Sequence, residues 1–292
     1  MTKLLDLGDI SDKQSLLIFG GCYSNLAATQ ALMQWAEDHS YLPDQCICTG
    51  DIVAYCAEPI ETTKLIRQWG VHCIQGNVEQ SLANNIDDCG CGFESGTTCD
   101  ILSKGWFPYA DRLIQKSDRE WFTSLPEHIS FSFSGKQCLV VHGAISDVSQ
   151  FMFASHSDER FQNEFALNDQ AEIVIAGHSG LPFTKIFEDE KNDLSKIWHN
   201  SGALGMPAND GTDAVWFSTL TIVSNESDNK VEFKHHRLEY DAHQSSSSMQ
   251  SNGLNQGYEQ ALIDGIWPSM DVLPKREKQQ QGISIQTSCI LA

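Results

Sequence analysis

The sequence predicts an α/β fold in which two mixed sheets pack face to face with helices outside. Apolar runs alternate with amphipathic stretches along most of the chain, which is typical of strands that alternate with helices. Several of these runs end at glycine followed by a polar side chain, and from 185 to 240 the pattern indicates strands only. A chain of 292 residues is also long enough to bury a sizeable core.

Three short apolar runs and two helices are expected in the first quarter of the chain. The runs are 16–19, 46–48 and 71–74. Ser24 or Asn25 is expected to cap the first helix, because a side-chain oxygen there accepts a hydrogen bond from a free N–H group of the first turn. Pro59 opens the second helix and Gly70 ends it.

The middle of the chain is less regular. Residues 86–109 are rich in Gly, Cys and Thr and are predicted to form a long loop. The elements expected after this loop are a helix at 118–124 capped by Ser117 and strands at 139–141 and 173–175. Hairpin turns are expected at 192–193 and 225–229.

The composition divides the chain into a domain at 1–243, a polar linker at 244–257 and a C-terminal extension at 258–292. The linker is rich in Ser, Gln and Asn. The extension is expected to be partly ordered, with a helix at 258–266 and a mobile polar stretch at 275–282. Trp267 is expected to pack against the domain, and a lid over the site is the alternative.

The net charge and the cysteine content limit the classes of partner and the cellular location that we expect. The net charge of −20 disfavours nucleic acid, because a strongly negative field repels polyanions. No secretory signal and no membrane-spanning window is legible, so a membrane partner is not expected. Ten cysteines without such a signal indicate reduced thiols and a cytoplasmic location. The oligomeric state is left open.

Four predicted strands end beside a side chain that binds metals. We call these four the strand-end residues: Asp51, Asn77, His142 and His178. Loops at the carboxyl ends of strands converge on one point in α/β sheets. Two hard oxygens and two imidazole nitrogens suit one divalent ion, namely Mn, Fe or Zn.

The order of these motifs resembles that of the calcineurin-like metallophosphoesterases, in the prokaryotic branch related to diadenosine tetraphosphatases. The resemblance extends from about 16 to 220 and includes Gly50–Tyr55 and the segment Trp198–Pro207. It implies a four-layer α/β/β/α sandwich. It also implies a hydrolase that holds two metal ions at the strand ends.

The departures from the family pattern fall on one of those two metals. Gly21, Tyr23 and Gly180 stand where the family has ligands of its first metal. The four strand-end residues match the complete ligand set of the second metal, with Asp51 in the bridging position. The resemblance therefore implies a mononuclear site. Tyr23 is expected to fill the vacated volume as a packed ring, with a phenolate ligand as the less favoured role.

The leading hypothesis is a metal-dependent hydrolase of a small phosphorylated molecule, phosphatase or phosphodiesterase, with Asp51, Asn77 and His142 as catalytic residues. Asn200 and Glu79 are expected to support the ligands. Val78 replaces the family histidine that assists the leaving group, so fast turnover is not expected. The alternative is a pseudophosphatase that binds a ligand or partner.

A third hypothesis concerns cysteines outside the predicted strands. A redox or metal-handling protein would use them for thiol chemistry. The candidates are Cys89, Cys91 and Cys289.

Overall fold

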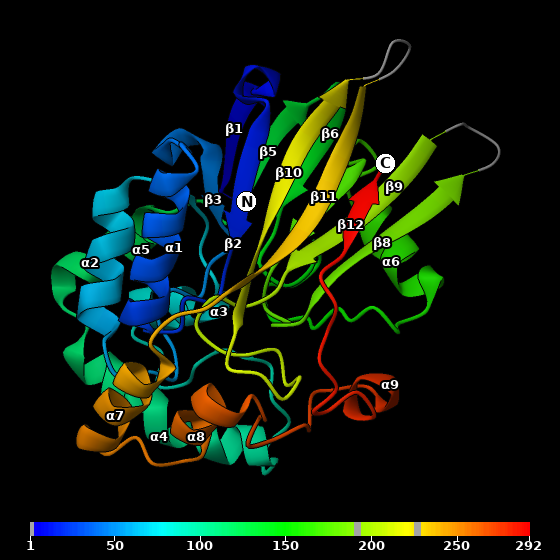
Figure 1. The fold of residues 1–292 in the computed structure, drawn as a ribbon. Coiled ribbons are helices and arrows are strands. Elements are labelled where there is room, and N and C mark those ends of the chain that lie inside the picture. Colours follow the sequence, from blue (N-terminus) through cyan, green and yellow to red (C-terminus); the bar gives the residue numbers. More distant parts are fainter. Residues whose placement is uncertain (1–2, 190–193, 225–228) are drawn as a thin grey trace.

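Two mixed sheets of six strands each form the centre of the computed structural model, within the residues that it describes (Figure 1). These residues are 3–189, 194–224 and 229–292. The turn expected at 192–193 and most of that expected at 225–229 therefore lie outside the described residues. The predicted fold class is confirmed.

The first sheet has the strand order β1-β5-β6-β7-β9-β8. Its strands are β1 (Leu4–Asp9), β5 (His128–Phe133), β6 (Lys136–Val140), β7 (Ile173–Ala176), β8 (Pro182–Asp189) and β9 (Leu194–Ser201). The inner strands β6, β7 and β9 run parallel, whereas the pairs β5–β6 and β8–β9 are antiparallel.

The second sheet has the order β12-β11-β10-β2-β3-β4. Its strands are β2 (Ser15–Phe19), β3 (Cys46–Cys48), β4 (His72–Cys73), β10 (Val215–Ser224), β11 (Asn229–Leu238) and β12 (Cys289–Leu291). The strands β2, β3 and β4 are parallel and carry the first part of the predicted site.

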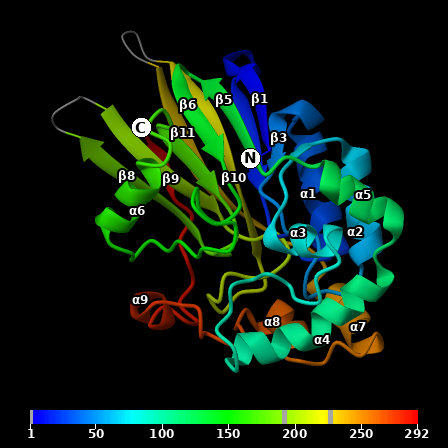
Figure 2. The ribbon, with the colours of Figure 1, turned by 180° about the vertical axis from the view of Figure 1, so that it is seen from behind.

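Helices cover the outer faces of the two sheets and one end of the sandwich, as Figures 1 and 2 show from opposite sides. They are α1 (Leu26–Asp38), α2 (Pro59–Trp69), α3 (Asn77–Ala83), α4 (Thr98–Leu113), α5 (Lys116–Ser124), α6 (Asp158–Phe165), α7 (Ala242–Ser251), α8 (Tyr258–Asp264) and α9 (Lys275–Lys278). Asn25 caps α1 by accepting a hydrogen bond from the N–H of Ala28, and Gly70 ends α2 in a left-handed conformation.

Alternation along the strands explains the layers. In β2, Leu16 and Ile18 face the core between the two sheets, while Leu17 and Phe19 face the core beneath the helices. A third cluster lies on the outer face of the first sheet, where Phe161 of α6 packs. Three cores between four layers follow from strands that are apolar on both faces.

The structure differs from the sequence prediction in the loop at 86–109. Helix α4 occupies much of this segment and begins at Thr98, with the Thr97 side chain accepting a hydrogen bond from the N–H of Asp100. Trp106 and Phe107 are buried on this helix. The residues before Thr98 are rich in Gly, Cys and Thr, so the apolar period of the helix is hard to recognise in the sequence.

The predicted linker at 244–257 is also wrong over much of its length, because α7 occupies 242–251. The side chain of Ser245 donates a hydrogen bond to Asn25 Oδ1, and Met249 is buried beneath the helix. Tertiary contacts of this kind stabilise a segment whose polar composition alone predicts a coil.

The predicted C-terminal helix is confirmed as α8, but the polar stretch at 275–282 is not simply mobile. It contains α9, and Gly282 N donates to Asn209 O at 3.0 Å. The chain then adds β12 to the edge of β11 (Figure 1). No described helix is long and apolar enough to cross a membrane.

Candidate metal centre

The strand-end residues come from both sheets. Asp51 follows β3 and Asn77 opens α3 just after β4, both at the end of the second sheet. His142 follows β6 and His178 follows β7, at the corresponding end of the first sheet. Asp51 and His178 have φ angles of 54° and 57°. Such left-handed backbone is uncommon for residues with a side chain and occurs at turns and at functional sites.

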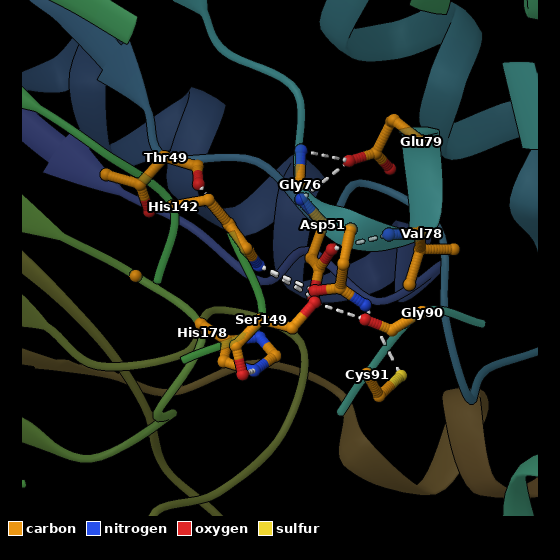
Figure 3. A network of polar contacts seen from close by, with 12 residues as sticks. Thr49, Asp51, Gly76, Val78, Glu79, Gly90, Cys91, His142, Ser149 and His178 are labelled. Carbon is orange, nitrogen blue, oxygen red and sulfur yellow. Dashed lines mark hydrogen bonds and ion pairs between the residues drawn. The ribbon is translucent and has the colours of Figure 1, made fainter. Parts of the chain in front are cut away.

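The imidazole of His142 is oriented by the backbone of the strand β3 loop. Its Nδ1 donates to the Thr49 carbonyl oxygen at 2.6 Å (Figure 3). In the neutral ring, Nε2 then carries a lone pair. This Nε2 lies 3.2 Å from Asp51 Oδ2 and 3.0 Å from Asn77 Oδ1.

Asn77 presents its oxygen to His142 because its amide nitrogen is already engaged. Nδ2 donates to the Cys89 carbonyl oxygen at 2.9 Å and lies 3.4 Å from Cys91 Sγ. Three electron-pair donors thus converge on one buried point. A bound cation satisfies such a set. Burial alone would lower the pKa of His142, but the charge of Asp51 outweighs it and raises the pKa, so a proton on Nε2 satisfies the same set when no cation is bound.

His178 completes the group. Its Nε2 donates to the Ser149 carbonyl oxygen at 3.0 Å, which leaves Nδ1 for another partner (Figure 3). Ligand atoms of Asp51, His142 and His178 all lie within 4.8 Å of one another. Burial, assisted by the neighbouring His142, lowers the pKa of His178 to about 3. The ring is therefore neutral, which is the form that binds metals.

Glu79 fixes the two loops that carry Asp51 and Asn77. Its Oε2 accepts hydrogen bonds from Asp51 N at 2.8 Å and Gly76 N at 2.9 Å, and its Oε1 accepts one from Val53 N at 3.1 Å (Figure 3 shows the first two residues beside it). Burial, followed by the negative charge of Asp51, raises the pKa of Glu79 to about 7.

Asn200 fixes the loop of the first sheet that carries His178. Its Nδ2 donates to the Gly177 carbonyl oxygen at 2.6 Å, and its Oδ1 accepts a hydrogen bond from Gly202 N at 3.0 Å. Gly177 directly precedes His178, so Asn200 holds the loop from which that ring projects. Glu79 and Asn200 thus lie where residues that orient metal ligands are needed.

Aromatic rings lie against Gly21 and Gly180, two of the positions where the resemblance implies ligands of a first metal. A Cβ atom on Gly21 would lie 2.7 Å from Cζ of the Tyr23 ring, and one on Gly180 would lie 3.4 Å from Cη2 of Trp267. Burial, followed by the charge of Asp51, raises the pKa of the Tyr23 phenol well above its usual range. Tyr23 is therefore a neutral packed ring.

The cysteines take different places from those expected. Cys89 and Cys91 are buried and their sulfur atoms face each other, so they are more than simple loop cysteines. Gly90 between them has a φ of 66°, which lets the chain turn sharply enough to bring them together. Cys289 is exposed on β12, at the edge of the second sheet.

Sequence reasoning missed three supporting groups of the site. The Thr49 and Ser149 carbonyl oxygens orient the two histidines, and the loop at 89–91 orients Asn77. Backbone carbonyl groups carry no sequence signal of their own. The only available signal was the Cys-Gly-Cys sequence itself.

A pocket opens beside the strand-end residues and reaches the helices of the C-terminal segment. Asp51, His178 and Cys91 line it. It is also lined by six aromatic side chains from α8, from the segment after α8 and from loops of the domain: Tyr23, Tyr55, Phe93, Phe151, Tyr258 and Trp267. The pocket therefore joins the polar ligand set to a largely apolar cavity.

The fold and the ligand set define a metal-binding phosphoesterase domain, and comparison with known proteins agrees. The model of the calcineurin-like phosphoesterase superfamily domain matches residues 11–223. The chain belongs to this family, as the resemblance of its motifs implied.

Individual relatives are distant in sequence. The uncharacterized protein MJ0912 of Methanocaldococcus jannaschii is 24% identical over 267 residues, covering 87% of this chain and 99% of its own. A metallophosphoesterase from Sphaerobacter thermophilus has a TM-score of 0.62 at 19% identity, over 86% of this chain and 100% of that chain. Hypothetical protein PH1004 from Pyrococcus horikoshii has a TM-score of 0.66 at 15% identity, over 86% and 98%. Both of these solved structures have the same fold as this chain.

Proposed function

We propose that this protein is a phosphoester hydrolase that uses one divalent metal ion, held by the four strand-end residues. The observation that carries the proposal is the convergence of Asp51 Oδ2 and Asn77 Oδ1 on His142 Nε2, at 3.2 and 3.0 Å, with His178 beside them. Two hard oxygens and two imidazoles suit Mn, Fe or Zn.

A divalent ion in this set would supply Lewis-acid chemistry toward a phosphoryl oxygen and lower the pKa of a bound water. The side chains have separate tasks. Asp51 provides the anionic ligand and faces the pocket, while His142 and Asn77 lie deeper. His178 lines the pocket with Asp51 and stays neutral, because burial lowers its pKa.

Hydrolysis of aryl phosphate esters by the metal-loaded protein tests this function. Asp51→Asn is nearly isosteric but removes the anionic ligand, so we expect turnover to fall by at least about 100-fold together with bound metal. Asp12→Asn, at an exposed carboxylate that precedes β2, is the matched control and should keep both. Turnover in Asp51→Asn equal to that of the unchanged protein would refute the assignment.

One observation favours a second candidate, a binding module without turnover. Tyr23 and Trp267 lie against two of the implied first-metal positions, and Val78 offers no proton to a leaving group. A pseudophosphatase would bind the metal through the same residues and yet hydrolyse no phosphate monoester or diester. The same assay separates the two, because metal content and turnover are measured on one sample.

A further inference from the structure

The loop between α3 and α4 contacts the groups that orient two of the strand-end residues. Asn77 Nδ2 donates to the Cys89 carbonyl oxygen at 2.9 Å. The Ser149 hydroxyl donates to the Gly90 carbonyl oxygen, and the carbonyl oxygen of the same serine accepts the hydrogen bond from His178 Nε2 at 3.0 Å (Figure 3). Asn77 belongs to the second sheet and His178 to the first. A shift of this loop would therefore disturb ligands on both sides of the site.

Two sulfur atoms face each other within this loop, which we call the cysteine loop (89–91). The Cα atoms of Cys89 and Cys91 are 5.4 Å apart, within the range that a disulfide spans. The N–H of Cys91 donates to the Cys89 sulfur at 3.3 Å, and such a hydrogen bond favours a thiolate. Asn77 Nδ2 lies 3.4 Å from the Cys91 sulfur. The two cysteines can therefore form or break a bond beside a metal-ligand candidate.

The pocket beside the strand-end residues connects the cysteine loop to small molecules. Cys91 lines this pocket together with Asp51 and His178. The volume that water-sized molecules can reach is about 60 Å³, and about 10 to 15 Å³ of such volume holds one water. A molecule close to water in size, such as hydrogen peroxide, fits this space, whereas a bulky oxidant such as a peptide disulfide does not. Cys91 is the sulfur of the loop that such a molecule meets first.

We propose that the cysteine loop is a redox switch of the metal site, in which hydrogen peroxide converts its two thiols to a disulfide. Peroxide oxidises the Cys91 thiol to a sulfenic acid and is itself reduced to water. The Cys89 sulfur then attacks the Cys91 sulfur. The bond between the sulfurs forms, and the hydroxyl group leaves with the Cys89 proton as a second water. This regulation rests on the proposed metal site and deepens the proposed function.

Disulfide formation is expected to tighten metal binding. Non-bonded heavy atoms stay roughly 3.5 to 4 Å apart, whereas bonded sulfurs are about 2 Å apart. Reduction therefore pushes the two sides of the loop apart and weakens its hold on Asn77, which contacts the Cys89 carbonyl oxygen and the Cys91 sulfur. Loss of a group that orients a metal ligand typically lowers metal affinity by about 10- to 100-fold. The reduced protein should accordingly bind metal at least about 10-fold more weakly than the oxidised protein.

Thiol counting and Mn²⁺ binding test the proposal without turnover. The full chain carries Cys289→Ala, because that exposed thiol would react by itself. The metal-free protein is reduced with dithiothreitol and freed of it, and half is treated with hydrogen peroxide, which is then removed. Thiols counted after denaturation should fall by two per chain and return with dithiothreitol. Competition with a chelator should show the tighter Mn²⁺ binding in the oxidised half. Mn²⁺ is suitable because soft thiol ligands bind it weakly.

Cys89→Ser separates the bond from the sulfur that contacts Asn77. It keeps Cys91 and cannot close the disulfide, so peroxide should leave its Mn²⁺ affinity unchanged. Cys99→Ser is the matched control, since Cys99 lines the same pocket and lies outside the cysteine loop. This control should respond to peroxide as its parent does. A response lost in Cys99→Ser and kept in Cys89→Ser would overturn the assigned pair.

Two results on the parent protein would also overturn the proposal, and neither needs a substitution in the loop. A thiol count that peroxide leaves unchanged would show that the disulfide does not form. Equal Mn²⁺ affinity of the reduced and oxidised forms would show that the bond does not act on the site, while the proposed function would stand. Absence of Mn²⁺ binding in both forms would instead refute the metal site, on which the switch depends.

Discussion

At the scale of single residues, His142 shows how one hydrogen bond defines the chemistry of a site. The Thr49 carbonyl oxygen accepts the proton on Nδ1, and this directs Nε2 toward Asp51 and Asn77, where it can bind a cation in the neutral ring. A histidine that donates one ring nitrogen to a backbone carbonyl is the usual arrangement of a metal ligand. The orientation exists before any ligand binds, so little reorganisation is needed.

Glu79 is the residue whose loss should disturb both ligand loops at once. Glu79→Gln places an amide NH₂ where backbone N–H groups now donate to a carboxylate, so at least one donor loses its acceptor. We expect the free energy of unfolding to fall by about 1 to 3 kcal/mol, measured by urea denaturation. The exposed Glu94→Gln should change it by less than about 0.5 kcal/mol. Equal stability of the two variants would contradict the role assigned to Glu79.

Cys91 is expected to act on the metal through Asn77. Cys91→Ala removes the sulfur that lies 3.4 Å from Asn77 Nδ2 and breaks the pair with Cys89. Loss of a group that orients a metal ligand typically lowers metal affinity by about 10- to 100-fold, which competition with a chelator measures. Cys289→Ala, on the exposed edge strand, is the control. An unchanged metal affinity in Cys91→Ala would show that the loop does not orient the ligand.

At the scale of elements, the polar residues at the strand ends can be predicted from the sequence, whereas most of the groups that orient them cannot. Gly-Asp after β3 and Gly-His after β7 are local patterns, because a buried strand followed by glycine and a polar residue marks a turn at the edge of a sheet. The fold class follows from the same alternation. The loop at 89–91 contacts Asn77 only after the chain has folded, so no local pattern announces its role.

The C-terminal elements illustrate the same limit. Helix α7 is polar and becomes helical by packing on α1, with Ser245 bonded to Asn25. Strand β12 has only three residues and exists because β11 offers an unpaired edge. Helix α9 likewise has no periodic apolar face of its own. Contacts far apart in the sequence decide all three, and local propensity is a weak guide in such cases.

The packing of Trp267 on Gly180 yields a prediction for the segment after α8. Gly180→His places a ring where Trp267 now lies and also forces a side chain onto a φ of 69°. Trp267→Ala makes room for that ring. We therefore expect Gly180→His to destabilise the Trp267→Ala protein less than the unchanged protein, with a coupling of about 0.5 to 3 kcal/mol in urea unfolding.

Gly96→His provides the matched control for backbone strain. Gly96 has a φ of 82° and no atom within 4 Å of an added Cβ, so this variant carries the strain without the clash. Gly96→His and Trp267→Ala should have additive effects. Additive effects of Gly180→His and Trp267→Ala would show that the tryptophan does not occupy the volume of a side chain at position 180.

At the scale of the whole molecule, the packing of the two sheets brings the four strand-end residues together. Each sheet alone contributes two strand-end residues, and neither pair can surround an ion. The core between the sheets, formed by side chains such as Ile18 of β2 and Val140 of β6, holds the two strand ends together. Loss of this packing would therefore remove the ligand set before it removed either sheet.

Metal content per chain, measured by elemental analysis after saturation with Mn²⁺ or Zn²⁺ and removal of excess ion, tests the central claim most directly. The account predicts one ion per chain in the unchanged protein and close to none in Asp51→Asn, with both proteins folded by circular dichroism. Two ions per chain in the unchanged protein, or one ion retained in Asp51→Asn, would contradict a single site built from the four strand-end residues.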